Sequence, residues 1–317
     1  MISVLRAAGF VTVQDLGRTG HRAAAVPPGG ALDRLALEAA NLLVGNSPDA
    51  AGLEWSVGPG EIRFERAATV ALAGALVDAR LEGRRLPAAR AIALEAGSVL
   101  EIRGFERGAW LYLAVAGGIA VPPVLGSRAT YEPGRFGGLE GRPLRAGDLL
   151  PVGALGPRRS VPAAGAGPPR SAAIDPEIFV GRTGEPIPLL PGPERCLLSD
   201  AEWRRLVEGE FRVSQAVSRM GYRLEGARLT VAEEREPPSA PVAPGVVQVP
   251  PGGAPIVLLA DGPTVGGYPR VAVIPTAYLG RLVQRRPGEP VRFREIGMVE
   301  ARAALRERRA LLDRLRA

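Results

Sequence analysis

The sequence predicts a mainly β protein with two domains, and three observations support this prediction. The chain has 317 residues, more than one hydrophobic core usually organises, which fits two domains of about 150 residues each. Between residues 53 and 152, short apolar runs alternate with glycine or proline, as in an antiparallel sheet or barrel. The second half shows the same pattern, and only a few segments have helical periodicity.

The first half begins with two short strands and a helix. Residues 2–5 and 11–13 are predicted strands that lead into the polar turn 14–18. Gly45 and Asn46 supply a helix stop. Apolar residues recur before this stop at the i, i+3, i+4 spacing of one helical face, at Leu32, Leu35, Ala36, Ala39 and Leu43.

Short strands follow this helix. Residues 59–60 and 83–84 fit hairpin turns, and 111–115 are apolar enough for a central strand. The predicted strands of this region are 61–64, 69–73, 77–81, 91–94, 99–102 and 110–116.

A stretch rich in Gly, Pro and Ala, residues 153–173, is typical of a solvated linker between domains. The domains are therefore predicted at 1–152 and 174–297. Residues 298–317 carry six arginines and predict an exposed amphipathic helix, which we expect to pack on the second domain rather than on a partner. Its narrow apolar stripe comprises Leu305, Leu311, Leu312 and Leu315.

The second half contains one further predicted helix and several strands. Ser199 is a good N-cap for a helix over 200–207, and Glu202 completes a capping-box pattern. The segment 26–30, Val-Pro-Pro-Gly-Gly, recurs at 249–253, which fits two domains of similar build. The predicted strands are 211–213, 222–225, 246–249, 255–260, 271–274 and 291–293.

The composition excludes several classes of function. Hydrophobic residues make up 46% and charged residues 23%, as in globular proteins. The net charge is +7, yet the chain contains no lysine, so it has no Schiff-base lysine, no P-loop lysine and no biotin-bearing lysine. The arginines form no patch interleaved with aromatic residues, which argues against nucleic-acid binding.

No apolar run approaches the roughly 20 residues needed to span a bilayer, so we expect no membrane association. The N-terminal residues lack the apolar stretch and cleavage site of a secretory signal. The sequence therefore predicts a cytoplasmic protein.

Standard catalytic signatures are absent. There is no Cys-x-x-Cys, His-Glu-x-x-His, Gly-x-Ser-x-Gly or Walker motif. The single histidine, His21, favours an ordinary imidazole over a catalytic one, and Cys196 has no motif around it that would activate a thiol. We predict no metal site.

A glycine-rich segment, 260–270, is the first candidate site. Gly266 and Gly267 let backbone N–H groups approach an anion, Thr264 offers a hydroxyl, and Arg270 offers a bidentate cation. A purely structural turn between two buried strands is the alternative.

Two other segments are candidates. If 218–226 is extended, Arg219 and Arg223 share one face and form an anion clamp, unless Glu225 and other acids neutralise them. In the first half, 26–33 places the backbone of Gly29 and Gly30 and the carboxylate of Asp33 before a helix and its positive dipole end. Asp33 could also serve only the first turn of that helix.

These segments also carry a family resemblance that runs over nearly the whole chain, apart from the linker and the arginine-rich tail. The chain resembles KipA-like proteins, also called allophanate hydrolase subunit 2 or the C-type subunit of 5-oxoprolinase, which are related to biotin-dependent carboxyltransferases. The motifs are 12–18, 26–33, 40–46, 116–119 and 126–128 in the first half, and 219–226, 248–252, 261–269 and 286–288 in the second.

The resemblance implies two cyclophilin-like β-barrel domains with a few short helices. It also implies a hydrolase of a cyclic amide, active in complex, that opens 5-oxoproline to glutamate with ATP and its accompanying Mg²⁺. The implied partners are a KipI-like subunit (the B-type subunit of 5-oxoprolinase) and a LamB/YcsF-like subunit (the A-type subunit).

The candidate segments then receive roles. We expect Arg219, Arg223 and Thr264 to be catalytic, holding phosphate, carboxylate and a developing oxyanion. The expected substrate-binding residues are Gly29, Gly30, Asp33, Tyr222, Gly266, Gly267, Tyr268 and Arg270, with those of the first half on the opposite wall of the site.

Three positions depart from the family pattern. Ser218 stands where an aspartate is usual, Val265 where a second threonine is usual, and Gly29 where a serine is common. A mechanism that needs those hydroxyls or that carboxylate would therefore not operate here.

Two other functions fit the same resemblance. One is carboxyl transfer in a biotin-dependent urea or amide carboxylase system, with biotin on a separate carrier because this chain has no lysine. The other is a non-catalytic antagonist that binds a KipI-like inhibitor of a sensor kinase.

Overall fold

The computed structural model describes residues 1–154, 174–182, 184–232 and 238–316. They form two compact units, and each unit combines separate stretches of chain. Most of the predicted linker, from residue 155 to 173, lies outside the described residues. Unit 1 comprises Met1–Arg18, Gly29–Val180 and Ala310–Ala317, and unit 2 comprises Thr19–Pro28 and Gly181–Arg309. Both units are built mainly from strands, which confirms the predicted fold class.

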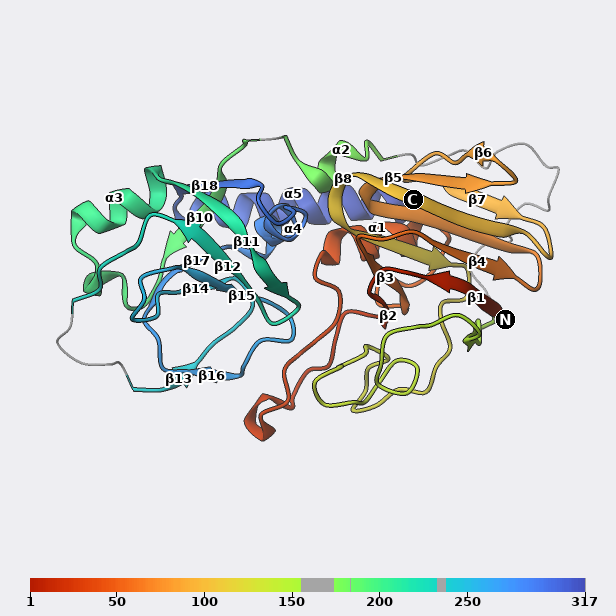
Figure 1. The fold of residues 1–317 in the computed structure, drawn as a ribbon, viewed down its shortest axis with the longest axis horizontal. Coiled ribbons are helices and arrows are strands. Elements are labelled where there is room, and N and C mark those ends of the chain that lie inside the picture. Colours follow the sequence, from red (N-terminus) through yellow and green to blue (C-terminus); the bar gives the residue numbers. More distant parts are fainter. Residues whose placement is uncertain (155–173, 183, 233–237, 317) are drawn as a thin grey trace. The chain divides into compact units, whose positions relative to one another are not determined.

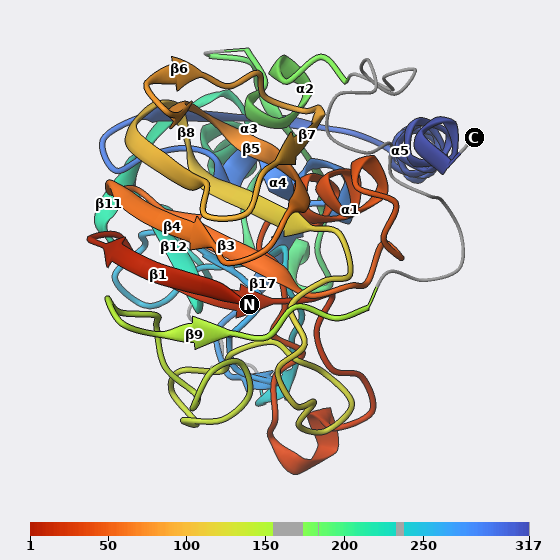
Figure 2. The same ribbon diagram turned by 90° about the vertical axis from the view of Figure 1, so that its right-hand side faces the viewer.

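Unit 1 is built on a nine-stranded antiparallel sheet within the described residues. Its order is β2-β3-β8-β4-β1-β9, with β5 paired to β8 and with β6 and β7 paired to β5 (Figures 1 and 2). The strands are β1 (Ile2–Ala7), β2 (Val11–Gln14), β3 (Gly52–Ser56), β4 (Gly60–Phe64), β5 (Ala68–Leu81), β6 (Arg84–Arg85), β7 (Ala91–Leu94), β8 (Val99–Val115) and β9 (Leu149–Leu150).

Strands β5 and β8 correct the sequence prediction, which divides each of them into two short strands. They pair along most of their length, with register shifts around Gly74, Leu76 and Asp78. A β-bulge absorbs an extra residue and bends the strand without ending the ladder. Gly74, at φ +96°, therefore bends a continuous strand where the sequence pattern indicates a break.

Helix α1 (Arg34–Leu43) packs on β5 and β8 and confirms the predicted helix. Its buried face includes Ala36, Leu37 and Ala40, which are fully buried. The large aromatic and aliphatic core of unit 1 is formed by other residues, including Leu53, Trp55, Ile62, Phe64 and Leu72 of the sheet. Helix α2 (Glu177–Val180) also packs against β5.

Unit 2 contains a closed barrel of order β10-β17-β14-β15-β12-β11-β18, whereas the sheet of unit 1 does not close within the described residues. The parallel pairing of β10 with β18 closes the barrel, and the rings of Phe211 and Phe293 lie 6.0 Å apart inside it. The barrel strands are β10 (Ile187–Pro191), β11 (Glu210–Ser218), β12 (Gly221–Gly226), β14 (Val246–Gln248), β15 (Ile256–Leu258), β17 (Arg270–Val273) and β18 (Pro290–Glu295). A two-stranded sheet pairs β13 (Ala240–Pro241) with β16 (Val265–Gly266).

Three helices and two 3₁₀ turns complete the described elements. Helix α3 (Asp200–Glu208) begins at the predicted N-cap, because the Ser199 hydroxyl accepts a hydrogen bond from the Glu202 N–H at 3.2 Å. The Glu202 carboxylate, however, accepts from the Thr230 N–H at 3.0 Å rather than closing a capping box. The remaining elements are α4 (Thr276–Val283), α5 (Met298–Arg316) and the 3₁₀ turns Arg22–Ala24 and Arg195–Leu197.

The C-terminal helix α5 follows its predicted apolar stripe only in part. Leu312 and Leu315 are buried, while Leu305 is 53% exposed. Elsewhere, the sequence pattern missed several short elements, namely β3, β6, β9, β10, β13, β16, α2 and α4. None of the helices in the described part of the chain is long and apolar enough to cross a bilayer.

Candidate functional site

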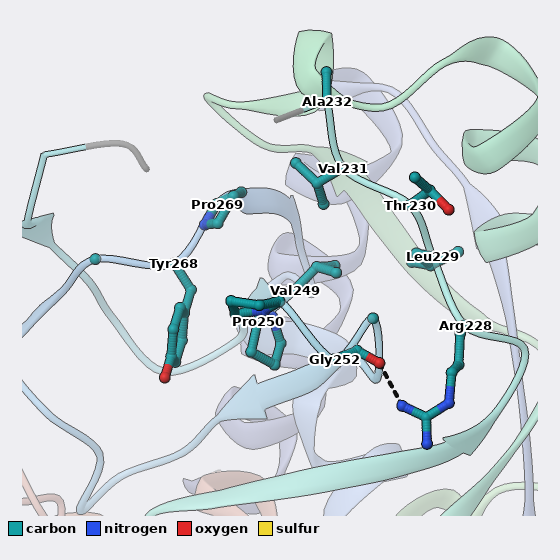
Figure 3. A pocket seen from close by; sticks show the side chains of 13 residues that line it. Arg228, Leu229, Thr230, Val231, Ala232, Val249, Pro250, Gly252, Tyr268 and Pro269 are labelled. Carbon is teal, nitrogen blue, oxygen red and sulfur yellow. Dashed lines mark hydrogen bonds between the residues drawn. The ribbon is translucent and has the colours of Figure 1, made fainter. Parts of the chain in front are cut away.

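Unit 2 carries a pocket of about 410 Å³, which is drawn in Figure 3. Three segments line it: residues 228–232, 249–253 and 267–269. The second segment directly follows β14 and the third lies between β16 and β17, so strands of unit 2 fix both walls. The volume falls within the range of small-molecule sites, about 300–1,000 Å³.

Two of the predicted binding residues, Gly267 and Tyr268, line this pocket. The segment 249–253, the second copy of the Val-Pro-Pro-Gly-Gly repeat, forms another wall. The sequence revealed this repeat but did not place it in a site. The wall at 228–232 was missed altogether, because only tertiary folding brings Arg228 beside Gly252.

The pocket walls contain backbone donors. In the described residues, the N–H groups of Gly252, Gly267 and Tyr268 make no hydrogen bond, which leaves them available to a ligand. Such N–H groups suit a carbonyl oxygen or an oxyanion. The phenol of Tyr268, whose residue is 46% exposed, adds an aromatic surface.

Gln248 holds the third wall in place. Its buried Nε2 donates to the Tyr268 carbonyl oxygen at 3.0 Å. A Cβ atom at residue 266 would lie only 2.8 Å from the same Nε2. Gly266 is therefore needed for the close packing of the loop on Gln248, rather than for direct contact with the pocket.

Arg270 also anchors this loop. Its backbone N–H and its Nε donate to Glu194 Oε2 at 2.9 and 2.8 Å, and its Nη1 donates to the Pro241 carbonyl at 3.0 Å. Hydrogen bonds from the Arg270 side chain hold the pKa of Glu194 below its usual 4.5. The charge of Arg270 is thus neutralised, and its contribution is to position the wall at 267–269.

Arg219 has a comparable structural partner. Its Nε and Nη2 donate to Oδ2 and Oδ1 of Asp261 at 2.8 and 3.0 Å, and both side chains are buried. The Asp261 N–H returns a bond to the Arg219 carbonyl at 3.0 Å. This two-way contact fixes the start of the glycine-rich segment, so the predicted clamp of Arg219 with Arg223 does not form as two exposed cations.

The other predicted residues of unit 2 are dispersed. Arg223 lies on β12, where its backbone pairs with Ile256, and its exposed side chain makes no ion pair or hydrogen bond within the described residues. Thr264 is 8% exposed, and its carbonyl, rather than its hydroxyl, accepts from the Val242 N–H. Tyr222 lies in the barrel core with 2% exposure, and its hydroxyl donates to the Val283 carbonyl at 2.9 Å. It therefore offers almost no surface to a ligand.

In unit 1, Gly29 and Gly30 adopt positive φ angles of 61° and 81°. A Cβ atom on Gly30 would lie 2.5 Å from the Gly17 backbone nitrogen, so glycine is required by close backbone contact. Asp15 fastens the same region, because its carboxylate accepts from Gly17 N–H at 2.8 Å and from the Ser127 hydroxyl at 2.6 Å. The first-half motifs of the sequence thus meet in one place.

Asp33 caps helix α1 and lies at the edge of a buried polar network. Its Oδ1 accepts from the Ala36 N–H at 3.2 Å, and its own N–H donates to the Tyr112 hydroxyl at 2.7 Å. That hydroxyl donates to Glu54 Oε2 at 2.7 Å. Burial, together with the neighbouring carboxylate of Glu54, raises the pKa of Tyr112 well above its usual value, so the phenol stays protonated and donates.

The predicted residues therefore fall into two groups. Gly29, Gly30 and Asp33 belong to unit 1, and the glycine-rich loop belongs to unit 2. Their convergence on one site stays a prediction. Within the described residues, no group of three or more His, Cys, Asp or Glu side chains could hold a metal ion.

The fold is that of a β-rich protein of two units, with a loop-lined pocket in the unit that contains the closed barrel. A match to the family described as "Carboxyltransferase domain, subdomain A and B" covers residues 24–295. The chain belongs to this family, which confirms the resemblance predicted from the motifs.

Two 5-oxoprolinase subunits are similar in sequence to this chain over almost its full length. The C-type subunit of the Escherichia coli 5-oxoprolinase is 39% identical over 99% of this chain and 97% of its own length. The protein of the same name from Haemophilus influenzae is 32% identical over 100% of this chain and 98% of its own. The crystal structure of the K. lactis urea amidolyase superimposes with a TM-score of 0.86 at 26% identity, covering 99% of this chain but 20% of that one.

Proposed function

We propose that this chain is the C-type subunit of an ATP-dependent 5-oxoprolinase, a hydrolase of a cyclic amide that works with KipI-like and LamB/YcsF-like subunits. The observation that carries the proposal is the similarity to the E. coli 5-oxoprolinase subunit over almost the entire length of both chains. The pocket of unit 2 supports it, because its size and mixed polar and apolar lining suit a small lactam.

The reaction converts 5-oxoproline, ATP and water to glutamate, ADP and phosphate. A lactam is a stable amide, so its carbonyl oxygen first attacks the γ-phosphorus of ATP and ADP leaves. One water then adds to the activated carbon and the ring C–N bond breaks, with the nitrogen taking up a proton, which leaves an acyl phosphate. A second water adds to the same carbon and the C–O bond to phosphate breaks, so that two waters are consumed in total. Mg²⁺ accompanies ATP and offsets the charge of its phosphates.

This chain's residues would serve the reaction in different ways. The N–H groups of Gly252, Gly267 and Tyr268, which have no partner within the described residues, would donate to the lactam oxygen or to an oxyanion. Arg219 and Arg270 act by positioning, since Asp261 and Glu194 neutralise them. Arg223 and Thr264 keep donor groups free of partners within the described residues, and we propose that they contact a ligand in the complex.

The test is to co-express this chain with its KipI-like and LamB/YcsF-like partners and to measure ATP-dependent release of glutamate from 5-oxoproline. Release that requires this chain supports the proposal. A stable complex of all three proteins that releases no glutamate contradicts it and favours carboxyl transfer or the antagonist role.

Two substitutions then test the residue roles. Thr264→Val removes a hydroxyl while keeping the side-chain volume, and Arg223→Gln removes an exposed cation. Both leave the buried ion pairs intact, and because Thr264 is buried, denaturant unfolding of each variant separates loss of turnover from loss of the fold. If both variants retain full glutamate release, the catalytic assignment of these residues is wrong.

Carboxyl transfer is the second candidate, favoured by the structural match to the K. lactis urea amidolyase. In that case a biotin-bearing carrier would deliver a carboxyl group to urea or another amide, since this chain has no lysine to carry biotin. Incubation with carboxylated carrier protein and urea, followed by measurement of the carboxylated product, distinguishes this activity from lactam hydrolysis.

A further inference from the structure

Arg228 is the one charged residue among the described residues that line the pocket of unit 2. Its Nη1 donates to the Gly252 carbonyl, a neutral group. Within the described residues no carboxylate pairs with it, unlike Arg219 and Arg270, whose charges face Asp261 and Glu194. The pocket therefore contains one positive charge that the rest of the described protein does not neutralise.

The position of this charge is fixed by the backbone around it. The Leu229 N–H donates to the Gly253 carbonyl at 2.9 Å, and the Gly253 N–H donates to the Pro250 carbonyl at 2.8 Å. The Glu202 carboxylate of helix α3 accepts from the Thr230 N–H at 3.0 Å. The wall that carries Arg228 is therefore held both by the opposing turn and by a helix, and the bond to the Gly252 carbonyl orients the exposed guanidinium.

The remainder of the lining is suited to the uncharged part of a small molecule. Figure 3 shows Tyr268 and Arg228 on opposite sides of Pro250 and Gly252. The other lining residues provide apolar surface. Among the described residues, no Asp or Glu side chain lines the pocket. One guanidinium at one end matches a single carboxylate, because their planar geometries allow two parallel hydrogen bonds. A nucleotide triphosphate would bring far more negative charge than this lining offsets.

We propose that the pocket binds a small cyclic organic acid, with its carboxylate on Arg228 and its ring against Tyr268 and Pro250. The identity of the acid as 5-oxoproline rests on the proposed function, whereas the carboxylate preference rests on the lining itself. Arg228 is thus a specificity-determining residue, in place of the neutralised arginines Arg219 and Arg270.

The test compares two ligands that differ only in the carboxylate. The full chain is titrated calorimetrically with 5-oxoproline, with 2-pyrrolidinone, which is the same lactam without the carboxylate, and with inorganic phosphate. We expect 5-oxoproline to bind most tightly. In the Arg228→Gln variant the affinity for 5-oxoproline should fall about tenfold or more, as expected for loss of a charged hydrogen bond. Its affinity for 2-pyrrolidinone should not change. Arg228→Lys should restore part of the loss.

A matched control is Arg292→Gln, which removes an exposed arginine of unit 2 that is paired with Glu210 outside the pocket. The Arg292→Gln variant should bind both lactams with the same affinity as the unaltered chain. The proposal is overturned if the unaltered chain binds no 5-oxoproline or binds phosphate as tightly as the acid. It is also overturned if Arg228→Gln weakens the binding of both lactams equally or of neither.

The same variants separate this inference from the proposed function. The complex is assembled with Arg228→Gln and assayed for glutamate release. If the complex binds 5-oxoproline through Arg228 but does not hydrolyse the lactam, the binding site is supported and the proposed function is contradicted. Unchanged turnover and KM in the variant complex would support the proposed function but contradict the assignment of Arg228 to the binding site.

Discussion

Arg219 and Asp261 form a two-point ion pair in the interior of unit 2, with side chains that are 6% and 2% exposed. The residues are 42 positions apart in the sequence. Together with the return bond from the Asp261 N–H, the pair joins the turn after β11 to the start of the glycine-rich segment.

Arg219→Gln should therefore destabilise the protein, because it leaves the Asp261 carboxylate buried without its cation. Removing one partner of a buried pair costs about 3–5 kcal/mol. Denaturant unfolding of the purified variant and of the unaltered chain measures this loss of unfolding free energy. Arg223→Gln is the matched control, since Arg223 is exposed and pairs with nothing in the described residues, and should change the unfolding free energy by less than about 0.5 kcal/mol. Equal stability of the two variants would contradict a structural role for Arg219.

The Glu194–Arg270 pair should make the stability depend on acid pH. The folded-state pKa of Glu194 is lowered, first through the Arg270 side-chain hydrogen bonds. The stabilisation is therefore complete above the ordinary pKa of 4.5 and is lost as the pH falls through the lowered folded value. Glu194→Gln should cost about 1–2 kcal/mol at neutral pH and flatten the loss of stability below pH 4.5.

Unfolding free energies measured across this acid range test the prediction. Glu225→Gln serves as the control, because Glu225 is exposed and has no ion pair among the described residues. Its pH profile should follow that of the unaltered chain. An equally steep acid dependence in Glu194→Gln would rule out this pair as its source.

Gly266→Ala should loosen the third wall of the pocket. The new Cβ would lie 2.8 Å from Gln248 Nε2, and the displaced amide would lose its hydrogen bond to the Tyr268 carbonyl. We expect a stability loss of about 1 kcal/mol and weaker binding of 5-oxoproline. Gly104→Ala places a methyl group in open space and should alter neither quantity. Unaffected binding in Gly266→Ala would mean that Gln248 does not position the wall.

Gly30→Ala should disrupt the backbone contact at the entrance to helix α1. Gly20 has a similar φ of +89° but open space around its Cβ position, so Gly20→Ala isolates the cost of the dihedral angle, about 1–2 kcal/mol. Gly30→Ala adds a contact of 2.5 Å with the Gly17 nitrogen and should cost about 1–3 kcal/mol more. Thermal unfolding of both variants provides the comparison, and equal melting temperatures would contradict it.

The fold class could be predicted because strand and helix patterns are local. The existence of helix α1, the N-cap of α3 at Ser199 and most barrel strands follow from spacing over a few residues. The buried face of α1 was predicted only in part, because Leu37 and Ala40 are buried while Leu35 and Leu43 are half-buried. Several short elements, including β3, β10, α2 and α4, were missed, since a few residues carry too little periodicity. The continuity of β5 and β8 was missed because a bulge at Gly74 resembles a strand break in sequence.

The candidate site was predictable only in part. The glycine-rich loop supplied Gly267 and Tyr268 to the pocket, as its composition indicated. The arginines could not be ranked, because a cation that binds a ligand and one that is neutralised internally look alike in sequence. Arg228, which precedes no motif, was not singled out at all.

By itself, the sequence determined that this is a lysine-free, mainly β protein of the carboxyltransferase family with glycine-rich loops, because composition and motifs are properties of the chain order. Only the tertiary structure decided that Arg219 and Arg270 meet carboxylates, whereas Arg228 of the pocket lining meets none within the described residues. Arg219 meets Asp261 and Arg270 meets Glu194 across 42 and 76 residues. Barrel closure sets these distances, and a carboxylate neutralises an arginine only where the fold brings the two within hydrogen-bonding reach.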